Sequence, residues 1–144
     1  MIYADTSFLF SLVLHDANTA AAKAYLKRNK ESLIFTPWQR YELRNAVRLS
    51  VWREHCPPML ANGALEQIDA DVAGGSLSET AIDWTDIIKR AEDLSAQHTT
   101  TVGVRSLELF HVASAISLKV RMFLTFDARQ FGAARAAGLN ARIP

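Results

Sequence analysis

Short apolar runs alternate with helix-like segments along the chain, and this alternation limits the possible folds more than any other feature. Residues 1–4, 33–35 and 122–126 are runs of the kind that form buried strands. Residues 77–82 are a weak strand or extended loop, and residues 139–143 are a candidate edge strand. Strands that alternate with helices favour a mainly parallel β-sheet with helices on its faces. We therefore predict an α/β fold.

Proline and glycine mark where several of the intervening helices begin and end. Pro37 suits the first turn of a helix, Pro57 and Pro58 exclude its continuation, and Gly74 ends the next one. The predicted helices cover residues 8–14, 20–30, 37–54, 59–72, 84–97 and 106–119, and a last one closes at Gly138. We expect the two helices between residues 37 and 74 to form a hairpin that projects from the sheet.

Polar residues predict the remaining helix boundaries. Thr6 or Ser7 is expected to cap the first helix, and Ser106 is expected to cap the sixth. Residues 99–103 are predicted to form a loop between the fifth and sixth helices.

The composition is that of one globular domain spanning residues 1–144, with 49% hydrophobic and 22% charged residues. A net charge of only +1 means that any nucleic-acid-binding surface must be local. The single cysteine, Cys56, excludes an internal disulfide and fits a reducing cytoplasm. The first apolar run begins at Met1, and no run approaches the roughly 20 residues needed to cross a bilayer. We therefore expect a cytoplasmic protein with neither a signal peptide nor a membrane span.

Four carboxylates occupy positions that suit a shared site. Asp5 and Asp127 each follow a predicted strand, whereas Glu42 and Glu108 lie on predicted helices. The carboxyl ends of strands in an alternating α/β fold converge on one crevice, where such folds bind ligands. Four acids in one crevice repel each other unless a divalent cation holds them, and hard carboxylate oxygens suit Mg²⁺ or Mn²⁺.

Helix periodicity places both glutamates on apolar faces. Each helical residue advances about 100°, so Ala46 and Leu49 lie within about 60° of Glu42, as does Asn45. Arg40, Arg44 and Arg48 form a separate stripe nearly opposite, which is either a solvated helix face or a surface that contacts RNA phosphates.

Glu108 has a similar setting on its own helix. His111, Val112 and Ala115 follow it at helical spacing, so this acid also lies on a buried face. A carboxylate on a buried face needs a partner, and a metal ion is one that would serve. Glu108 and His111 also match the Glu-x-x-His spacing of di-iron helix bundles, but the chain lacks the second such motif. His111 is therefore expected to pack in support of the helix or the site.

Four segments together resemble the PIN domain, and within it the VapC toxins of type II toxin–antitoxin systems. The segments are Asp5-Thr6-Ser7, residues 41–46 (YELRNA), residues 105–115 (RSLELFHVASA) and residues 123–130 (FLTFDARQ). They occur in the same order and at fitting separations over essentially the whole chain. The resemblance implies a PIN-like fold for the predicted α/β sheet.

The resemblance also implies a Mg²⁺- or Mn²⁺-dependent ribonuclease that attacks RNA with metal-activated water. Carried over by position, Asp5, Glu42, Glu108 and Asp127 would bind the metal and carry catalysis, and hydroxyl groups of Thr6, Ser7 and Thr125 would support them. The third acid is more often aspartate in this family, so Glu108 is a departure that affects how the metal is held. Implied partners are an RNA substrate, a small VapB-like antitoxin and a second copy of the chain in a homodimer.

Arginines near the acids are candidates for contacts with RNA. Arg44 lies within residues 41–46 and belongs to the arginine stripe, and Arg129 follows Asp127 by two residues.

Two other classes of function remain to be weighed against a ribonuclease. A PIN-like protein without activity would act as a binding or regulatory module, and Glu108 is the feature that favours it. An aspartyl-phosphate enzyme also needs an acid at a strand end, but its second aspartate two residues later is replaced here by Ser7.

Overall fold

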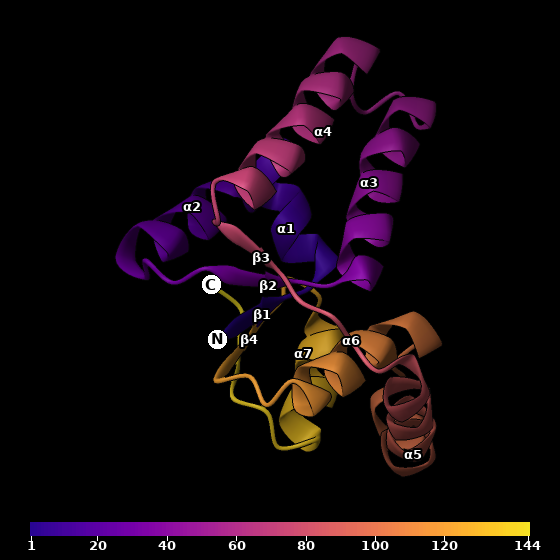
Figure 1. The fold of residues 1–144 in the computed structure, drawn as a ribbon. Helices are drawn as coiled ribbons and strands as arrows, with labels where there is room; N and C mark the ends of the chain where they lie inside the picture. The colour runs from indigo at the N-terminus through magenta and orange to yellow at the C-terminus, as the bar shows by residue number, and fades with distance from the viewer.

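The computed structural model describes residues 1–144 and has five strands in one parallel sheet (Figure 1). The strand order is β3-β2-β1-β4-β5, and every neighbouring pair runs parallel. This confirms the α/β prediction and the PIN-like arrangement of sheet and helices. The strands are β1 (Ile2–Ala4), β2 (Leu33–Phe35), β3 (Leu77–Glu79), β4 (Met122–Leu124) and β5 (Ala141–Arg142).

Seven helices cover the two faces of the sheet. Helices α1 to α4 lie on one side and α5 to α7 on the other, and α3 and α4 extend together away from the sheet as the predicted hairpin (Figure 1). The helices are α1 (Thr6–Val13), α2 (Thr19–Arg28), α3 (Pro37–Trp52), α4 (Pro58–Ala73), α5 (Trp84–Val102), α6 (Ser106–Ser117) and α7 (Ala128–Ala136).

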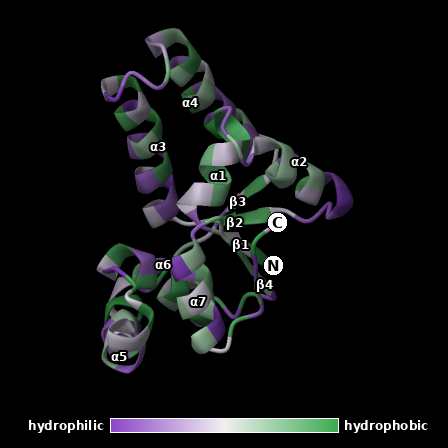
Figure 2. Cartoon of the chain, turned by 180° about the vertical axis from the view of Figure 1, so that it is seen from behind, coloured by the Kyte–Doolittle hydropathy of each residue, from purple (hydrophilic) through white to green (hydrophobic).

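The three central strands are buried on both faces because successive side chains point to opposite sides. In β1, Ile2 and Ala4 belong to the core under α1 to α4, whereas Tyr3 belongs to the core under α5 to α7. In β2, Phe35 likewise belongs to the core under α1 to α4 and Ile34 to the core under α5 to α7. The hydropathy view shows the strands enclosed between the two helical layers (Figure 2). Both layers therefore fix the position of β1, the strand that leads into Asp5.

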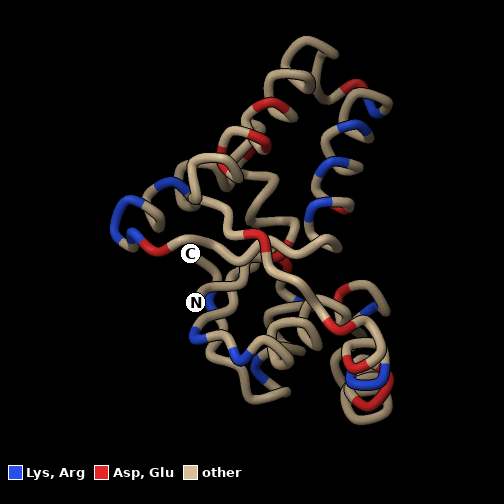
Figure 3. Tube along the Cα trace, in the orientation of Figure 1, with Lys and Arg blue, Asp and Glu red and all other residues tan.

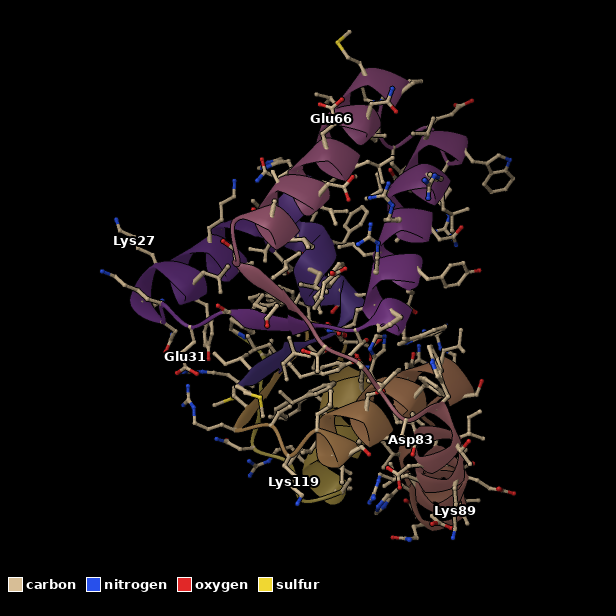
Figure 4. All side chains as sticks on the ribbon, in the orientation of Figure 1. Lys27, Glu31, Glu66, Asp83, Lys89 and Lys119 are labelled. Carbon is tan, nitrogen blue, oxygen red and sulfur yellow. The ribbon has the colours of Figure 1, made fainter.

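The polar outer surface agrees with this two-layer arrangement. Lys27 on α2, Glu66 on α4 and Lys89 on α5 extend outward from their helices (Figure 4). None of the helices combines the length and hydropathy needed to span a lipid bilayer.

Pro37 begins α3 as predicted, and the residues around it form a capping box. Gln39 Nα donates to Thr36 Oγ1 at 3.2 Å, while Thr36 Nα donates to Gln39 Oε1 at 2.7 Å. The Gln39 side chain is completely buried, and its Nε2 donates to the Ala4 carbonyl at 2.6 Å. Because β1 pairs with β2 only through Ile2 and Tyr3, this bond ties the end of β1 to α3. Gln39 thus links the first strand to the hairpin.

Three boundary predictions are wrong. The predicted loop at residues 99–103 is instead the last turn of α5. The helix continues to Val102 because that side chain packs against the core under α5 to α7. Gly103 then ends the helix in the left-handed conformation, with φ of 70°. Ser106 is the first residue of α6 rather than its cap, and the cap of α1 is Asp5 rather than Thr6 or Ser7.

Ion pairs join the two helices of the hairpin and the outer strand. Arg44 Nη1 lies 2.9 Å from Asp69 Oδ1 on α4, and Arg40 pairs with both Asp69 and Glu79 of β3. Basic residues along α3 and acidic residues along α4 are visible in the charge view (Figure 3). Part of the arginine stripe is therefore used within the fold.

We expect Gln39→Ala to lower the free energy of unfolding by about 1–3 kcal/mol, because it leaves the Ala4 carbonyl and the Thr36 amide without their buried partner. Urea unfolding followed by circular dichroism measures this. Gln67→Ala, on the exposed surface of α4, is the matched control and should change stability by less than about 0.5 kcal/mol. Equal losses in the two variants would contradict a structural role for Gln39.

Candidate acidic active site

The candidate site lies where the chain changes direction across the sheet. From β1 the chain builds outward through β2 to β3, and it then crosses to the other side of β1 to form β4 and β5. The carboxyl ends of β1 and β4 therefore flank the topological switch point, where open α/β sheets bind ligands. Asp5 follows β1 directly, and Asp127 lies three residues beyond the end of β4.

Asp5 is an almost fully buried carboxylate, only 2% exposed. Its Oδ1 accepts hydrogen bonds from Ser7 Oγ at 2.7 Å and from the Phe8 amide at 3.0 Å, which caps α1. Its Oδ2 accepts from Thr125 Oγ1 at 2.6 Å. Burial raises the pKa of Asp5, although these donors and the nearby His111 oppose the increase. The site therefore holds a charge that the fold has largely removed from water.

Thr125 connects Asp5 to Asp127. Its hydroxyl donates to Asp5, and its oxygen accepts from the Asp127 amide at 2.9 Å. Asp127 caps α7, because its Oδ1 accepts from the amides of Arg129 at 2.8 Å and Gln130 at 2.9 Å. Its Oδ2 accepts no hydrogen bond from the protein. Thr125 and Ser7 therefore both contact Asp5, and Asp127 keeps one oxygen available for a ligand.

Glu42 is half-buried on α3 and interacts with Thr6 and His111. The Thr6 hydroxyl donates to Glu42 Oε2, and His111 Nε2 lies 2.6 Å from the same oxygen. Burial by itself would raise the pKa of Glu42, but the hydrogen bond and charge of His111, with the Thr6 hydroxyl, lower it below its usual value. Glu42 is therefore held as a carboxylate.

His111 is a packed residue, as predicted, and it joins the site to the core. It is 3% exposed, and the buried hydroxyl of Tyr3 lies 2.9 Å from its Nδ1. Burial raises the pKa of Tyr3, so its phenol stays protonated and can donate to Nδ1. Since an ionised Glu42 only accepts, its contact with His111 requires a hydrogen on Nε2, and the Tyr3 hydroxyl can either donate to Nδ1 or accept from it. Tyr3 and His111 thereby fix the orientation of Glu42.

Glu108 is buried at the start of α6 but is used by Arg105. Its Oε2 accepts from the Arg105 amide at 2.8 Å, and its Oε1 accepts from Arg105 Nε at 2.7 Å. Glu108, through its hydrogen bond and charge, and Asp127, more weakly, raise the pKa of the Arg105 guanidinium. The Arg105 charge therefore lies close enough to interact with both acids. Sequence reasoning did not identify Arg105 as a partner of this site.

Gln130 is a second residue that sequence reasoning missed. It is 2% exposed, its Nε2 donates to the Glu108 carbonyl at 3.1 Å, and its Oε1 lies 3.2 Å from Thr125 Oγ1. Gln130 therefore links α6 to the Asp5–Thr125 pair. Its position three residues after the cap of α7 was the available signal, because that spacing places it in the first helical turn.

The four acids do not form a ready metal cage, although Thr125 joins Asp5 to Asp127 and Gln130 joins Thr125 to the Glu108 carbonyl. Nowhere do three or more His, Cys, Asp or Glu side chains surround a point that could hold a metal ion. Their donor chemistry nevertheless fits a hard divalent cation, since all are carboxylates. Thr125 contacts both Asp5 and Asp127, whereas Glu42 and Glu108 each already have a basic partner.

The two arginines predicted to contact RNA have different surroundings. Arg44 follows Glu42 by two residues, so it points away from the site, and it pairs with Asp69 in the hairpin. Arg129 is exposed immediately after Asp127, and its side chain makes no ion pair. The structure thus leaves Arg129 free beside the acids and commits Arg44 elsewhere.

We expect Asp5→Asn to stabilise the metal-free protein at neutral pH. Asparagine keeps an acceptor for the Phe8 amide but removes the buried charge, and each unit by which the pKa is raised corresponds to about 1.4 kcal/mol. Protonation of Asp5 makes its full contribution to the free energy of unfolding below the ordinary pKa of 3.8. That contribution is lost as the pH rises through the raised pKa of the folded protein. The variant's advantage should therefore grow with pH and then become constant.

Thermal unfolding in EDTA across about pH 4–8 measures this difference. Asp93→Asn, which changes an exposed aspartate of α5, is the control and should show no such trend. A lower melting temperature for Asp5→Asn than for wild type near pH 7 would contradict a desolvated charge at this position.

Three solved structures resemble this fold at low sequence identity. VapC20 of Mycobacterium tuberculosis, described as a sarcin–ricin loop cleaving toxin, has a TM-score of 0.69 at 17% identity, with 96% of each chain covered. FitAcB from Neisseria gonorrhoeae has a TM-score of 0.71 at 18% identity, over 100% of this chain and 98% of that one. PAE2754 from Pyrobaculum aerophilum has a TM-score of 0.64 at 14% identity, over 97% and 82%.

No curated protein sequence is significantly similar to this chain. The family model described as PIN domain, however, matches residues 2–137 and so includes all four acids. With the parallel sheet and the acidic residues at its switch point, this match establishes that the chain belongs to the PIN domain family.

Proposed function

We propose that this protein is a metal-dependent endoribonuclease and the toxin of a VapBC-like toxin–antitoxin system. The observation that carries the proposal is that Thr125 joins Asp5 to Asp127 at the switch point of a PIN-domain sheet. The fold-level likeness to VapC20, a toxin that cleaves the sarcin–ricin loop, supports RNA as the class of substrate.

The acids would hold Mg²⁺ or Mn²⁺ with oxygen ligands. Asp127 offers a free oxygen, and Asp5 is joined to it through the Thr125 hydroxyl. Glu42 and Glu108 would join by exchanging a present contact, with His111 or Arg105 respectively, for the ion. When bound, the cation would supply an acidified water and offset charge on the phosphodiester.

The chain's own residues orient the carboxylates and neutralise their charge. Ser7 and Thr125 donate to Asp5 and hold its plane, while Tyr3 acts through His111 to hold Glu42. These donors come from β1, α1, α6 and the loop after β4, so several elements of the fold fix the carboxylates before a ligand arrives. Arg129 would meet the phosphate backbone beside Asp127, as a cation without a protein partner.

Protein partners form part of the same proposal. A small antitoxin would inhibit the enzyme, and a second copy of this chain would complete a homodimer. Exposed apolar residues at the end of the hairpin, Trp52 at 79% and Met59 at 82% exposure, support a surface that another protein covers. Growth arrest on expression of the chain alone, relieved by co-expression of a small DNA-binding protein encoded beside it, would test this part.

Purified protein with Mn²⁺ is expected to cleave RNA, and Asp5→Asn and Asp127→Asn should each reduce the rate at least about 100-fold, because each removes a charge from the site. Mapping of cleavage ends in total RNA measures the reaction. Asp93→Asn should cleave at the wild-type rate, since Asp93 lies exposed on α5. Intact tRNA and rRNA over a wide range of Mn²⁺ concentrations would contradict the proposal.

A non-catalytic binding module is the second candidate, because both oxygens of Glu108 are bonded to Arg105. Thermal unfolding with Mn²⁺ separates the two functions. A metal that binds only the folded protein stabilises it by about 2.7 kcal/mol at 100 times its Kd. The nuclease is expected to show this stabilisation, and the module is expected to show none.

Glu108→Gln tests whether Glu108 holds the metal. Glutamine can still accept from the Arg105 amide, so the metal-free stability should change by less than about 1 kcal/mol, while stabilisation by Mn²⁺ should fall. Glu66→Gln, on the outer surface of α4 (Figure 4), is the matched control and should respond to Mn²⁺ like the wild type. An unchanged response in Glu108→Gln would remove Glu108 from the ligand set.

A further inference from the structure

A polar hollow of about 350 Å³ opens directly beside the candidate site, between α1 and α3. Thr6 and Ser7 form its near end, and their hydroxyls contact Glu42 and Asp5. Its volume lies in the range of small-molecule sites, roughly 300–1,000 Å³. The hollow therefore adjoins the acids through Thr6 and Ser7, and it is large enough for one nucleotide. Its remaining lining residues are Phe10, Asp16, Asn18, Ala46, Leu49, Ser50, Arg53 and His55.

Helix spacing extends this hollow along the face of α3 that carries Glu42. Ala46, Leu49 and Arg53 follow Glu42 by 4, 7 and 11 residues, so all three lie within about 40° of it around the helix. Eleven residues correspond to roughly 16 Å along the axis. Arg53 is thus placed on the side of the acids but farther from them than a single nucleotide extends.

The far end of the hollow presents polar groups that the fold does not use. The side chains of Arg53 and His55 are exposed and make no ion pair or hydrogen bond, and the side-chain amide of Asn18 makes no cap bond. The Asn18 backbone N–H, by contrast, donates to Asp16. Asp16 is the one acid of the lining, and its oxygens already accept from Ser11 Oγ at 2.7 Å and the Asn18 amide at 2.9 Å. Arg53 differs in this from Arg40 and Arg44, which are paired.

The backbone at the end of α3 turns at Glu54, just before His55, which lines the hollow. Glu54 adopts the left-handed conformation, with φ of 59°, which non-glycine residues rarely adopt. The His55 amide then donates back to the Ser50 carbonyl at 2.9 Å, and the Glu54 amide donates to Val51 at 2.9 Å.

We propose that this hollow binds unpaired RNA that adjoins the scissile phosphodiester, with Arg53 on a phosphate farther along the strand. Arginine suits phosphate because its planar guanidinium donates two parallel hydrogen bonds. Phe10, Ala46 and Leu49 offer an apolar floor for an unpaired base, and the Asn18 amide can donate to and accept from a base edge. This inference rests on the proposed nuclease function and names the segment of substrate that the hollow would select.

Arg53→Gln compared with Arg48→Gln tests the proposal. Both variants remove one exposed arginine from the same helix, but Arg48 lies about 120° from Glu42 and outside the hollow. The readout is the Kd of a fluorescein-labelled, random-sequence single-stranded RNA decamer, measured by fluorescence anisotropy in EDTA so that no cleavage occurs. Arg53→Gln should weaken binding about 5- to 10-fold and reduce the salt-dependence slope by about 0.7, as expected for one lost phosphate contact. Arg48→Gln should change the Kd less than about 2-fold.

Cleavage by the same preparations in Mn²⁺ separates the two proposals. If wild type cleaves RNA but Arg53→Gln binds like Arg48→Gln, the nucleotide subsite is refuted and the nuclease stands; this is also the result if a partner protein's peptide occupies the hollow. If RNA binding depends on Arg53 but no cleavage occurs, the subsite stands and the nuclease does not. Absence of both binding and cleavage refutes both.

Cross-linking of 4-thiouridine-labelled RNA to the unmodified protein gives an independent measurement. Adducts are expected on residues that line the hollow, in α1 and at the end of α3. Adducts confined to the outer faces of α4 or α5 would overturn the assignment.

Discussion

The buried charge of Asp5 is the constraint that the rest of this structure has to accommodate. The carboxylate lies at the end of the central strand, between two cores, where water can contribute almost nothing to its solvation. Three donors replace that water: Ser7, the Phe8 amide and Thr125. They come from the strand–helix turn and from the far end of the chain, so the charge is tolerated only when β1 and β4 are paired correctly. Correct pairing of β1 with β4 is therefore required both for the fold and for the candidate active site.

A network of hydrogen bonds connects Asp5 to the surroundings of the other acids. Thr125 bonds to Asp5 and to the Asp127 amide, and Gln130 connects the same hydroxyl to the backbone of Glu108. On the opposite side, Tyr3 and His111 carry a second chain of contacts to Glu42. Buried networks of this kind hold carboxylates rigidly when every member has a partner. Such rigidity suits acids that must be positioned for a cation and a phosphodiester.

Much of the fold and the positions of the acids could be predicted from sequence patterns. The apolar runs gave the strands of the parallel sheet, and helical spacing placed Glu42 and Glu108 on buried faces. Patterns failed where tertiary contacts overrode local preference. Residues 99–102 continue α5 because Val102 packs against the core under α5 to α7. Asp5 itself, rather than Thr6 or Ser7, caps α1. Gln130 had only its position in the first turn of α7 as a signal, because its partners Thr125 and Glu108 lie outside that helix. The Arg105–Glu108 contact is local, three residues apart, and sequence reasoning missed it.

The sequence by itself determined the α/β alternation, the hairpin between Pro37 and Gly74, and the acids that follow strands. These features are local, because backbone geometry and the periodicity of apolar residues act over a few residues. Only the tertiary structure decided which partner each acid has. Glu42 meets His111 across 69 positions of sequence and Asp5 meets Thr125 across 120, whereas Glu108 bonds to Arg105 nearby. Desolvation and hydrogen bonding depend on groups brought together from distant segments, and these set the protonation and freedom of each carboxylate.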